Sequence, residues 1–235
     1  MLVKICGLSN YIDTHNAIDS GADVLGFVMG GRILPVEIEP AAQKIRQIIK
    51  TVPSHIDSYL VTHLFDVDDM VDLANYVNAT GIQVSEYIGV QELKYLRART
   101  NKKIIKTIVV NDDAWLENLK SYERYCDYIL TDTMHAGYIG GTGIVNDWTR
   151  CKNIIQLSKK PVYIAGGLTP DNVHGAIQAT GPAGVDVCTG ISSYSSCYLR
   201  KDRKDEQKIK IFIERAKSFQ AVKKVKPVQV LQENF

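Results

Sequence analysis

The stretch Val3–Leu8 reads VKICGL, a short apolar run that closes on a cysteine and a glycine. An early strand pattern that ends at a reactive side chain predicts a strand–helix repeat whose first loop carries chemistry. Alternation along such a strand places Lys4 and Cys6 on one face, and Val3 and Ile5 on the other. Cys6 is therefore either a candidate catalytic base or a buried small hydrophobic residue.

Outward from this stretch, short apolar runs alternate about eight times with helix-length amphipathic segments. The expected strands are Leu2–Cys6, Val24–Met29, Tyr59–Leu64, Gly81–Val84, Lys103–Val109, Tyr128–Asp132, Pro161–Ala165 and Gly184–Cys188. This alternation implies a parallel sheet, and eight units favour a single α/β domain, a closed (β/α)8 TIM barrel. The rival is an open doubly wound sheet, which a Gly-x-Gly-x-x-Gly turn after the first strand would favour, and the chain has none there.

Helix signals lie between the strands. Apolar residues recur at helical spacing over Ala41–Val52, where Pro40 suits the first turn. A second helix is expected over Val67–Val77 with Asp66 as its N-cap. The barrel is expected to occupy residues 1–219. Residues 220–235 read as a C-terminal tail, either a loosely ordered terminus or a partner-binding segment.

Composition narrows the class of protein. The net charge of +2 gives no reason to expect a nucleic acid or a membrane as partner. No apolar run is long enough for a membrane span and no signal-peptide pattern opens the chain, so a cytoplasmic location is expected. The five cysteines form no Cys-x-x-Cys pair and the histidines show no ligand spacing, so we expect no metal. The oligomeric state stays open.

Two strand ends carry candidate catalytic groups. Active sites of such barrels lie at the carboxyl ends of the strands. Asp132 ends the sixth expected strand on one face with Tyr128 and Leu130, much as Cys6 ends the first. A thiol and a carboxyl group at two strand ends could act as base and acid on opposite sides of a substrate.

Glycine-bearing loops follow the last three strands. Glycines let backbone N–H groups approach an anion closely, and the loops after strands 7 and 8 are the usual phosphate cradle of this fold. A phosphorylated small molecule is therefore the expected ligand, although such glycines also serve tight turns. The candidate phosphate-binding residues are Gly141, Gly143, Gly166, Gly167, Thr189 and Gly190.

These motifs resemble the phosphoribosylanthranilate isomerase family of tryptophan biosynthesis, single-domain (β/α)8 enzymes. The resemblance spans about residues 2 to 219. It is carried by KICGL at 4–8, GADVLGFV at 21–28, GGTG at 140–143 with Asp147-Trp148, AGGLTPDNV at 165–173, VDV at 185–187, and Lys204-Asp205 with Lys208-Ile209.

The resemblance implies an Amadori rearrangement of an N-substituted phosphoribosylamine to an aminodeoxyketose phosphate, without a cofactor. Cys6 would be the general base and Asp132 the general acid. Cys6 would then act as a thiolate, which Lys4 could favour, whereas Asp132 would have to hold a proton well above the ordinary pKa of about 3.9.

The part of the site that would hold the anthranilate departs from the family pattern. Ser-Pro-Arg after the second strand is replaced by GGRILP at 30–35, and Gln-Leu-His-Gly after the fourth by QVSE at 83–86. Arg32 is an anion clamp or a solvated loop residue. His63 contacts the substrate or fills the barrel, and Gln83 lines the pocket or satisfies backbone groups. The alternatives are thus a divergent epimerase or lyase on another phosphorylated amino sugar, or a non-catalytic scaffold.

Overall fold

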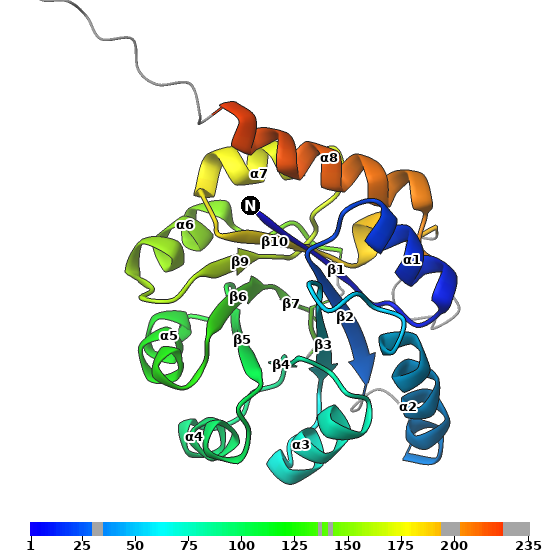
Figure 1. The fold of residues 1–235 in the computed structure, drawn as a ribbon. Helices are drawn as coiled ribbons and strands as arrows, with labels where there is room; N and C mark the ends of the chain where they lie inside the picture. The colour runs from blue at the N-terminus through cyan, green and yellow to red at the C-terminus, as the bar shows by residue number, and fades with distance from the viewer. Residues whose placement is uncertain (30–34, 136–137, 141–142, 194–202, 223–235) are drawn as a thin grey trace, which may run out of the picture.

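The computed structural model describes residues 1–29, 35–135, 138–140, 143–193 and 203–222. Within these residues eight parallel strands close into a barrel in the order β1-β10-β9-β6-β5-β4-β3-β2 (Figure 1). The barrel strands are β1 Leu2–Cys6, β2 Val24–Met29, β3 Asp57–Thr62, β4 Gly81–Val84, β5 Lys103–Val109, β6 Tyr128–Asp132, β9 Val162–Ile164 and β10 Gly184–Val187. The expected (β/α)8 fold is confirmed.

Helices surround the barrel and connect consecutive strands (Figure 1). They are α1 Tyr11–Asp19, α2 Pro35–Ile49, α3 Val67–Tyr76, α4 Val90–Arg99, α5 Trp115–Tyr122, α6 Trp148–Leu157, α7 Val173–Thr180 and α8 Glu206–Val222. Short 3-10 helices occupy Glu123–Tyr125 (η1) and Thr189–Ile191 (η2), and β7 Met134–His135 pairs antiparallel with β8 Tyr138–Ile139. No helix among the described residues has the length and apolar character needed to cross a membrane.

The starts of α3 and α2 can be compared with the residues predicted to begin them. The Asp66 carboxylate accepts a hydrogen bond from the Asp69 N–H at 3.0 Å, which confirms the expected N-cap of α3. The expected position of Pro40 was wrong, because α2 begins at Pro35 and Pro40 lies inside it. Pro35 has the fixed backbone angle that suits a first helical position, so the earlier proline starts the helix.

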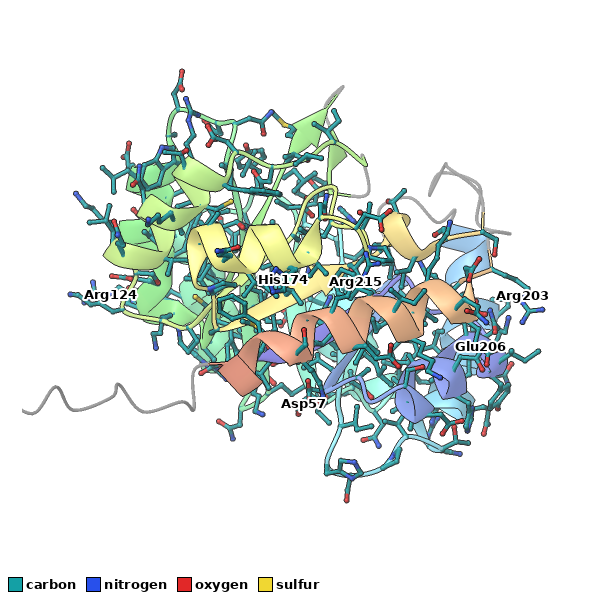
Figure 2. The ribbon with its side chains drawn as sticks, turned by 90° about the horizontal axis from the view of Figure 1, so that it is seen from above. Asp57, Arg124, His174, Arg203, Glu206 and Arg215 are labelled. Carbon is teal, nitrogen blue, oxygen red and sulfur yellow. The ribbon has the colours of Figure 1, made fainter. Side chains whose placement is uncertain are left out.

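Helix α8 closes the ring of helices against α7 and α1. Figure 2 shows Arg215 of α8 beside α7, where its guanidinium donates to Asp171 at 2.7 Å. The rings of His174 and Phe219 meet edge to face at 5.5 Å. Helix α8 extends to Val222, and residues 223–235 of the expected tail lie outside the described residues.

Three of the eight barrel strands have bounds that differ from the sequence prediction. Strand β3 begins two residues early, at Asp57, and ends at Thr62, so His63 follows the strand instead of lying in it. Strand β9 begins at Val162, one residue after the predicted start, and strands β9 and β10 end at Ile164 and Val187, each one residue before the predicted end. The register of β1 against β10 places Lys4 opposite Asp186.

Two hydrophobic layers flank the strands. The outer layer joins outward-facing residues such as Val3 and Ile5 to the helices. The inner layer fills the barrel and contains Val24, Tyr59, Ile105, Leu130, Tyr163 and Ala165. A Cβ atom at Gly81 would come within 2.3 Å of the Tyr59 ring, and one at Gly184 within 2.4 Å of the Tyr163 ring. Glycines on neighbouring strands thus make room for these rings.

Candidate active site

A buried ion pair joins the first and last strands of the barrel. Lys4 and Asp186 face each other in register, and the Lys4 ammonium group donates to the Asp186 carboxylate at 2.9 Å. Lys4 is completely buried. Burial alone would lower the pKa of Lys4, but Asp186 and Cys6 together raise it above its ordinary value. The Lys4 side chain therefore stays an ammonium ion inside the barrel.

Cys6 lies two residues beyond Lys4 along β1 and points into the barrel, as its alternation with Val3 and Ile5 predicts. Its thiol is buried and makes hydrogen bonds with Cys188 and with Lys4. The hydrogen bond with Cys188 and the burial raise the pKa of Cys6 well above its usual range, and the Lys4 ammonium opposes them. At neutral pH the resting group is the thiol.

Asp132 ends β6 and lines the pocket at the carboxyl ends of the strands. Its Oδ1 accepts a hydrogen bond from the Thr133 N–H at 2.8 Å. Burial of the carboxyl group raises the pKa of Asp132 to about 7, against the effect of the Thr133 hydrogen bond. The nearby Asp186 carboxylate adds to the increase and the Lys4 ammonium reduces it. A substantial part of Asp132 is therefore protonated at neutral pH.

The same pocket holds the glycine-bearing loops. Its lining residues are Asp132, Gly143, Ala165, Gly166, Gly167, Leu168, Asp186, Val187, Cys188, Thr189 and Gly190. Five of the six predicted phosphate-binding residues thus lie together, and Gly141 lies outside the described residues. The Thr189 hydroxyl oxygen is buried without a hydrogen-bond partner among the described residues, which suits a site that a polar ligand completes.

Close backbone packing explains why glycine is needed in this pocket. Gly167 has φ of +62°, and a Cβ there would come within 2.5 Å of the Ile144 and Val145 backbone. A Cβ at Gly190 would lie 1.9 Å from the Leu168 carbonyl oxygen. Larger residues would push the three loops apart. The glycines therefore bring the loop before α6 and the loops after β9 and β10 into contact.

Two of the three predicted aglycone residues, His63 and Gln83, lie on the part of the barrel mouth formed by β3 and β4. The buried His63 side chain contacts Glu86, with His63 Nδ1 2.7 Å from Glu86 Oε1. Gln83 is buried on β4, and its Nε2 donates to Ser85 at 3.3 Å while Oε1 has no partner among the described residues. Neither His63 nor Gln83 lines the pocket that contains Asp132. Arg32 lies outside the described residues.

Several residues at this end of the barrel had no predicted role. Asp186 is the partner of Lys4, Cys188 is the neighbour of Cys6, and Glu86 holds His63. Lys204, at the entry to α8, donates to the Cys188 carbonyl oxygen at 2.8 Å and to the Ser192 hydroxyl at 3.3 Å. The inward face of β10 could have indicated Asp186 and Cys188, because Gly184, Asp186 and Cys188 alternate along it.

Comparison with known proteins places this arrangement in a family. Residues 3–215 match the model of N-(5'-phosphoribosyl)anthranilate (PRA) isomerase. The N-(5'-phosphoribosyl)anthranilate isomerase of Methanocella arvoryzae is 34% identical over 216 residues, which cover 92% of this chain and 97% of that protein. The enzyme of Halorubrum lacusprofundi is 32% identical over 215 residues, covering 91% of this chain and 95% of that protein.

Solved structures agree with the sequence relatives. Phosphoribosyl anthranilate isomerase from Thermotoga maritima superposes with a TM-score of 0.78 at 27% identity, covering 93% of this chain and 99% of that chain. A phosphoribosyl anthranilate isomerase in complex with reduced 1-(o-carboxyphenylamino)-1-deoxyribulose 5-phosphate gives a TM-score of 0.75 at 26% identity, with the same coverage. The chain therefore belongs to the N-(5'-phosphoribosyl)anthranilate isomerase family, and it is an isomerase built on a (β/α)8 barrel.

Proposed function

We propose that the protein converts N-(5'-phosphoribosyl)anthranilate into 1-(2-carboxyphenylamino)-1-deoxyribulose 5-phosphate by an Amadori rearrangement. Asp132 is the general acid and Cys6 the general base. The observation that carries the proposal is the position of Asp132. Its carboxyl group has a pKa of about 7 and lines one pocket with five candidate phosphate-binding residues, while Cys6 ends a strand at the same mouth of the barrel.

The first chemical step uses the proton of Asp132. Asp132 donates it to the furanose ring oxygen, and the bond from that oxygen to the first sugar carbon breaks to give an iminium ion. A carboxyl group with a pKa near 7 is suited to this step, because an acid works best when its pKa lies near the working pH. The iminium nitrogen is itself an electron sink, so the reaction needs no cofactor.

The second step uses the sulfur of Cys6. The Cys6 thiolate removes the proton from the second sugar carbon, and the resulting enolamine tautomerises to the ketone. Lys4 contributes by donating a hydrogen bond to this sulfur, which stabilises the negative charge that the base must carry. Because the pKa of Cys6 lies above that of Asp132, the active form, thiolate with protonated acid, is a minor form of the resting enzyme.

Binding would orient the substrate across the barrel mouth. Gly143, Gly166 and Gly167, with the Thr189-Gly190 start of η2, hold the phosphate, and the free Thr189 oxygen supplies a polar contact. His63, held by Glu86, and Gln83 face the anthranilate. Gly141 and Arg32 remain predicted members of the two subsites.

Complementation of a tryptophan auxotroph that lacks this isomerase tests the proposal. The wild-type chain should restore growth without tryptophan, and Cys6→Ala or Asp132→Asn should abolish the rescue. Cys126→Ala is the matched control, because Cys126 is also buried but belongs to the outer hydrophobic layer. Failure of a well-expressed wild-type chain to turn over N-(5'-phosphoribosyl)anthranilate in vitro would refute the substrate and favour another phosphorylated amino sugar.

A further inference from the structure

A second thiol lies against Cys6. Strands β1 and β10 pair in parallel with Ile5 opposite Val187. Cys6, the last residue of β1, and Cys188, the residue directly after β10, each follow one residue beyond this pair. Both side chains take the inward direction, and their thiols are in hydrogen-bonding contact. Cys188 is partly exposed and lines the pocket that contains Asp132. A small molecule that enters this pocket therefore reaches Cys188 first and has Cys6 directly behind it.

The backbone spacing at this point suits a disulfide. Neighbouring strands lie about 4.8 Å apart. Disulfides join Cα atoms that are about 4.4–6.8 Å apart. Cys6 ends β1 and Cys188 directly follows β10, so the expected spacing of their Cα atoms falls in the range that a disulfide joins. The other described cysteines differ, because Cys126 and Cys151 lie in the outer hydrophobic layer and the Cys151 sulfur contacts Thr131.

Glycines on both sides leave space for the two sulfur atoms. A Cβ at Gly7 would come within 2.7 Å of the Cys188 sulfur, and a Cβ at Gly26 within 2.9 Å of the Cys6 sulfur. Gly7 also has φ of +76°, which turns the chain away directly after Cys6. The pair is thus enclosed by backbone on two sides and meets the pocket on the third, so only a small reagent can approach.

Two ammonium groups support negative charge at the pair. Lys204 Nζ lies 3.6 Å from the Cys188 sulfur, and Lys4 donates a hydrogen bond to the Cys6 sulfur. A cysteine attacks an oxidant as the thiolate, and a neighbouring cation favours that form. Lys204 is buried and is fixed by the Cys188 carbonyl and the Ser192 hydroxyl, so its charge stays at this position.

We propose that Cys6 and Cys188 form an oxidative modification site, in which hydrogen peroxide joins the two sulfurs in a reversible disulfide and so switches the enzyme off. The Cys188 thiolate attacks one peroxide oxygen, the O–O bond breaks, and the products are a sulfenic acid and hydroxide, which takes up a proton to form water. The Cys6 sulfur then attacks the sulfenic sulfur, loses its proton and displaces a second water. Two thiols lose two electrons and one peroxide gains them. A dithiol reverses the step by exchange and is itself oxidised.

Formation of the disulfide does not depend on the proposed function. Its effect on the rate does rest on that function, because a disulfide sulfur cannot serve as the base. The two are therefore measured separately. The full-length protein is treated with hydrogen peroxide, digested without reduction and examined by mass spectrometry. The expected product is one peptide pair that contains Cys6 and Cys188, lighter than the sum of the two thiol peptides by two hydrogen atoms.

In parallel, the turnover of N-(5'-phosphoribosyl)anthranilate is measured before treatment, after hydrogen peroxide and again after dithiothreitol. The activity of each variant is expressed relative to that of the same variant before treatment. The wild type should lose its activity and recover most of it with dithiothreitol. In Cys188→Ser the cross-linked pair should be missing and the dithiothreitol-recoverable loss should disappear. Cys126→Ser is the matched control, and should keep both the cross-link and the recoverable loss.

Three results would overturn the proposal. The first is an intact, folded protein in which peroxide leaves Cys6 and Cys188 as thiols or converts them singly to higher acids. The second is a disulfide from either residue to Cys197 in place of the pair. The third is a Cys6–Cys188 cross-link in an active preparation that keeps full activity. Absence of isomerase activity in an untreated protein that still forms the cross-link would count against the proposed function and leave the disulfide standing.

Discussion

The inner layer of the barrel and the carboxyl-terminal mouth of the same strands have opposite compositions. The inner layer consists of aromatic and aliphatic side chains such as Tyr59 and Tyr163, which glycines on neighbouring strands accommodate. The mouth holds Cys6, Asp132 and, just below, the Lys4–Asp186 ion pair. One region stabilises the fold by burying apolar surface, and the other buries titratable groups at a cost in stability. The same eight strands supply both.

The largest expected effect is a loss of activity on substitution at the barrel mouth, without a loss of folding. Cys6→Ala and Asp132→Asn should each lower kcat/KM by roughly 10²–10⁴-fold, because each removes a proposed proton-transfer group. Both variants should stay folded by circular dichroism, since neither touches the inner layer. A variant that is folded and keeps wild-type kcat/KM would remove that residue from the proposed chemistry.

The next largest expected effect is a loss of stability on substitution in the inner layer. Tyr163→Ala should lower the free energy of unfolding by about 3–5 kcal/mol, because it empties a fully enclosed ring site in the inner layer. Tyr163→Phe keeps the ring and is the matched control. Denaturant titration measures the free energy of unfolding, and steady-state kinetics measure kcat/KM. Loss of kcat/KM in the folded fraction, without loss of stability, would show that the two regions are not separable in this way.

A smaller expected effect is the free-energy cost of burying the ionised Asp132 carboxylate. Its pKa of about 7 lies above its ordinary value of 3.8, so the folded state keeps a proton that the unfolded state has lost. Its contribution to stability is therefore fully present below about pH 4 and is lost as the pH rises to about 7. Asp132→Asn does not titrate, and Asn can still accept the Thr133 hydrogen bond. The difference between the two pKa values corresponds to about 4 kcal/mol for a fully buried group, and the partial exposure of the Asp132 side chain reduces it. The variant should therefore be more stable than the wild type at pH 8 by about 2 kcal/mol, and nearly equal to it at pH 4.

Unfolding curves at the two pH values test this cost. Asp127→Asn is a useful control, because Asp127 belongs to the same βα unit but lies outside the barrel mouth, where it pairs with Arg97. An Asp132→Asn variant that is less stable than the wild type at pH 8 would show that the ionised carboxylate stabilises the fold, which is the opposite of the expected cost of burying it.

The sequence allowed the barrel and the bounds of five of its eight strands to be predicted, because alternation and apolar runs are local signals. Lys4 and Cys6 share an inward face, and Asp132 ends β6, both as expected. The predicted bounds of β3 were two residues too late. Its first residues, Asp57 and Ser58, are polar and do not extend the apolar run, although Ser58 is buried.

Contacts between residues that are distant in the sequence could not be predicted. Lys4 and Asp186 are 182 residues apart, and only closure of the barrel brings them together. The contact between Cys6 and Cys188 depends on the same closure, as does the hydrogen bond from Lys204 to the Cys188 carbonyl. His63 and Glu86 meet because β3 and β4 are neighbours, and no local pattern marks them as a pair.

The pH dependence of kcat/KM for N-(5'-phosphoribosyl)anthranilate tests the central claim most directly. With the pKa of Asp132 at about 7 and that of Cys6 higher, kcat/KM should rise about tenfold per pH unit up to pH 7 and then level off. The plateau arises because each further loss of the Asp132 proton offsets the gain in Cys6 thiolate. In Asp132→Asn the rise should continue past pH 7. A wild-type profile that keeps rising through pH 7, or an Asp132→Asn profile that keeps the wild-type plateau, would contradict the assignment of Asp132 as the acid.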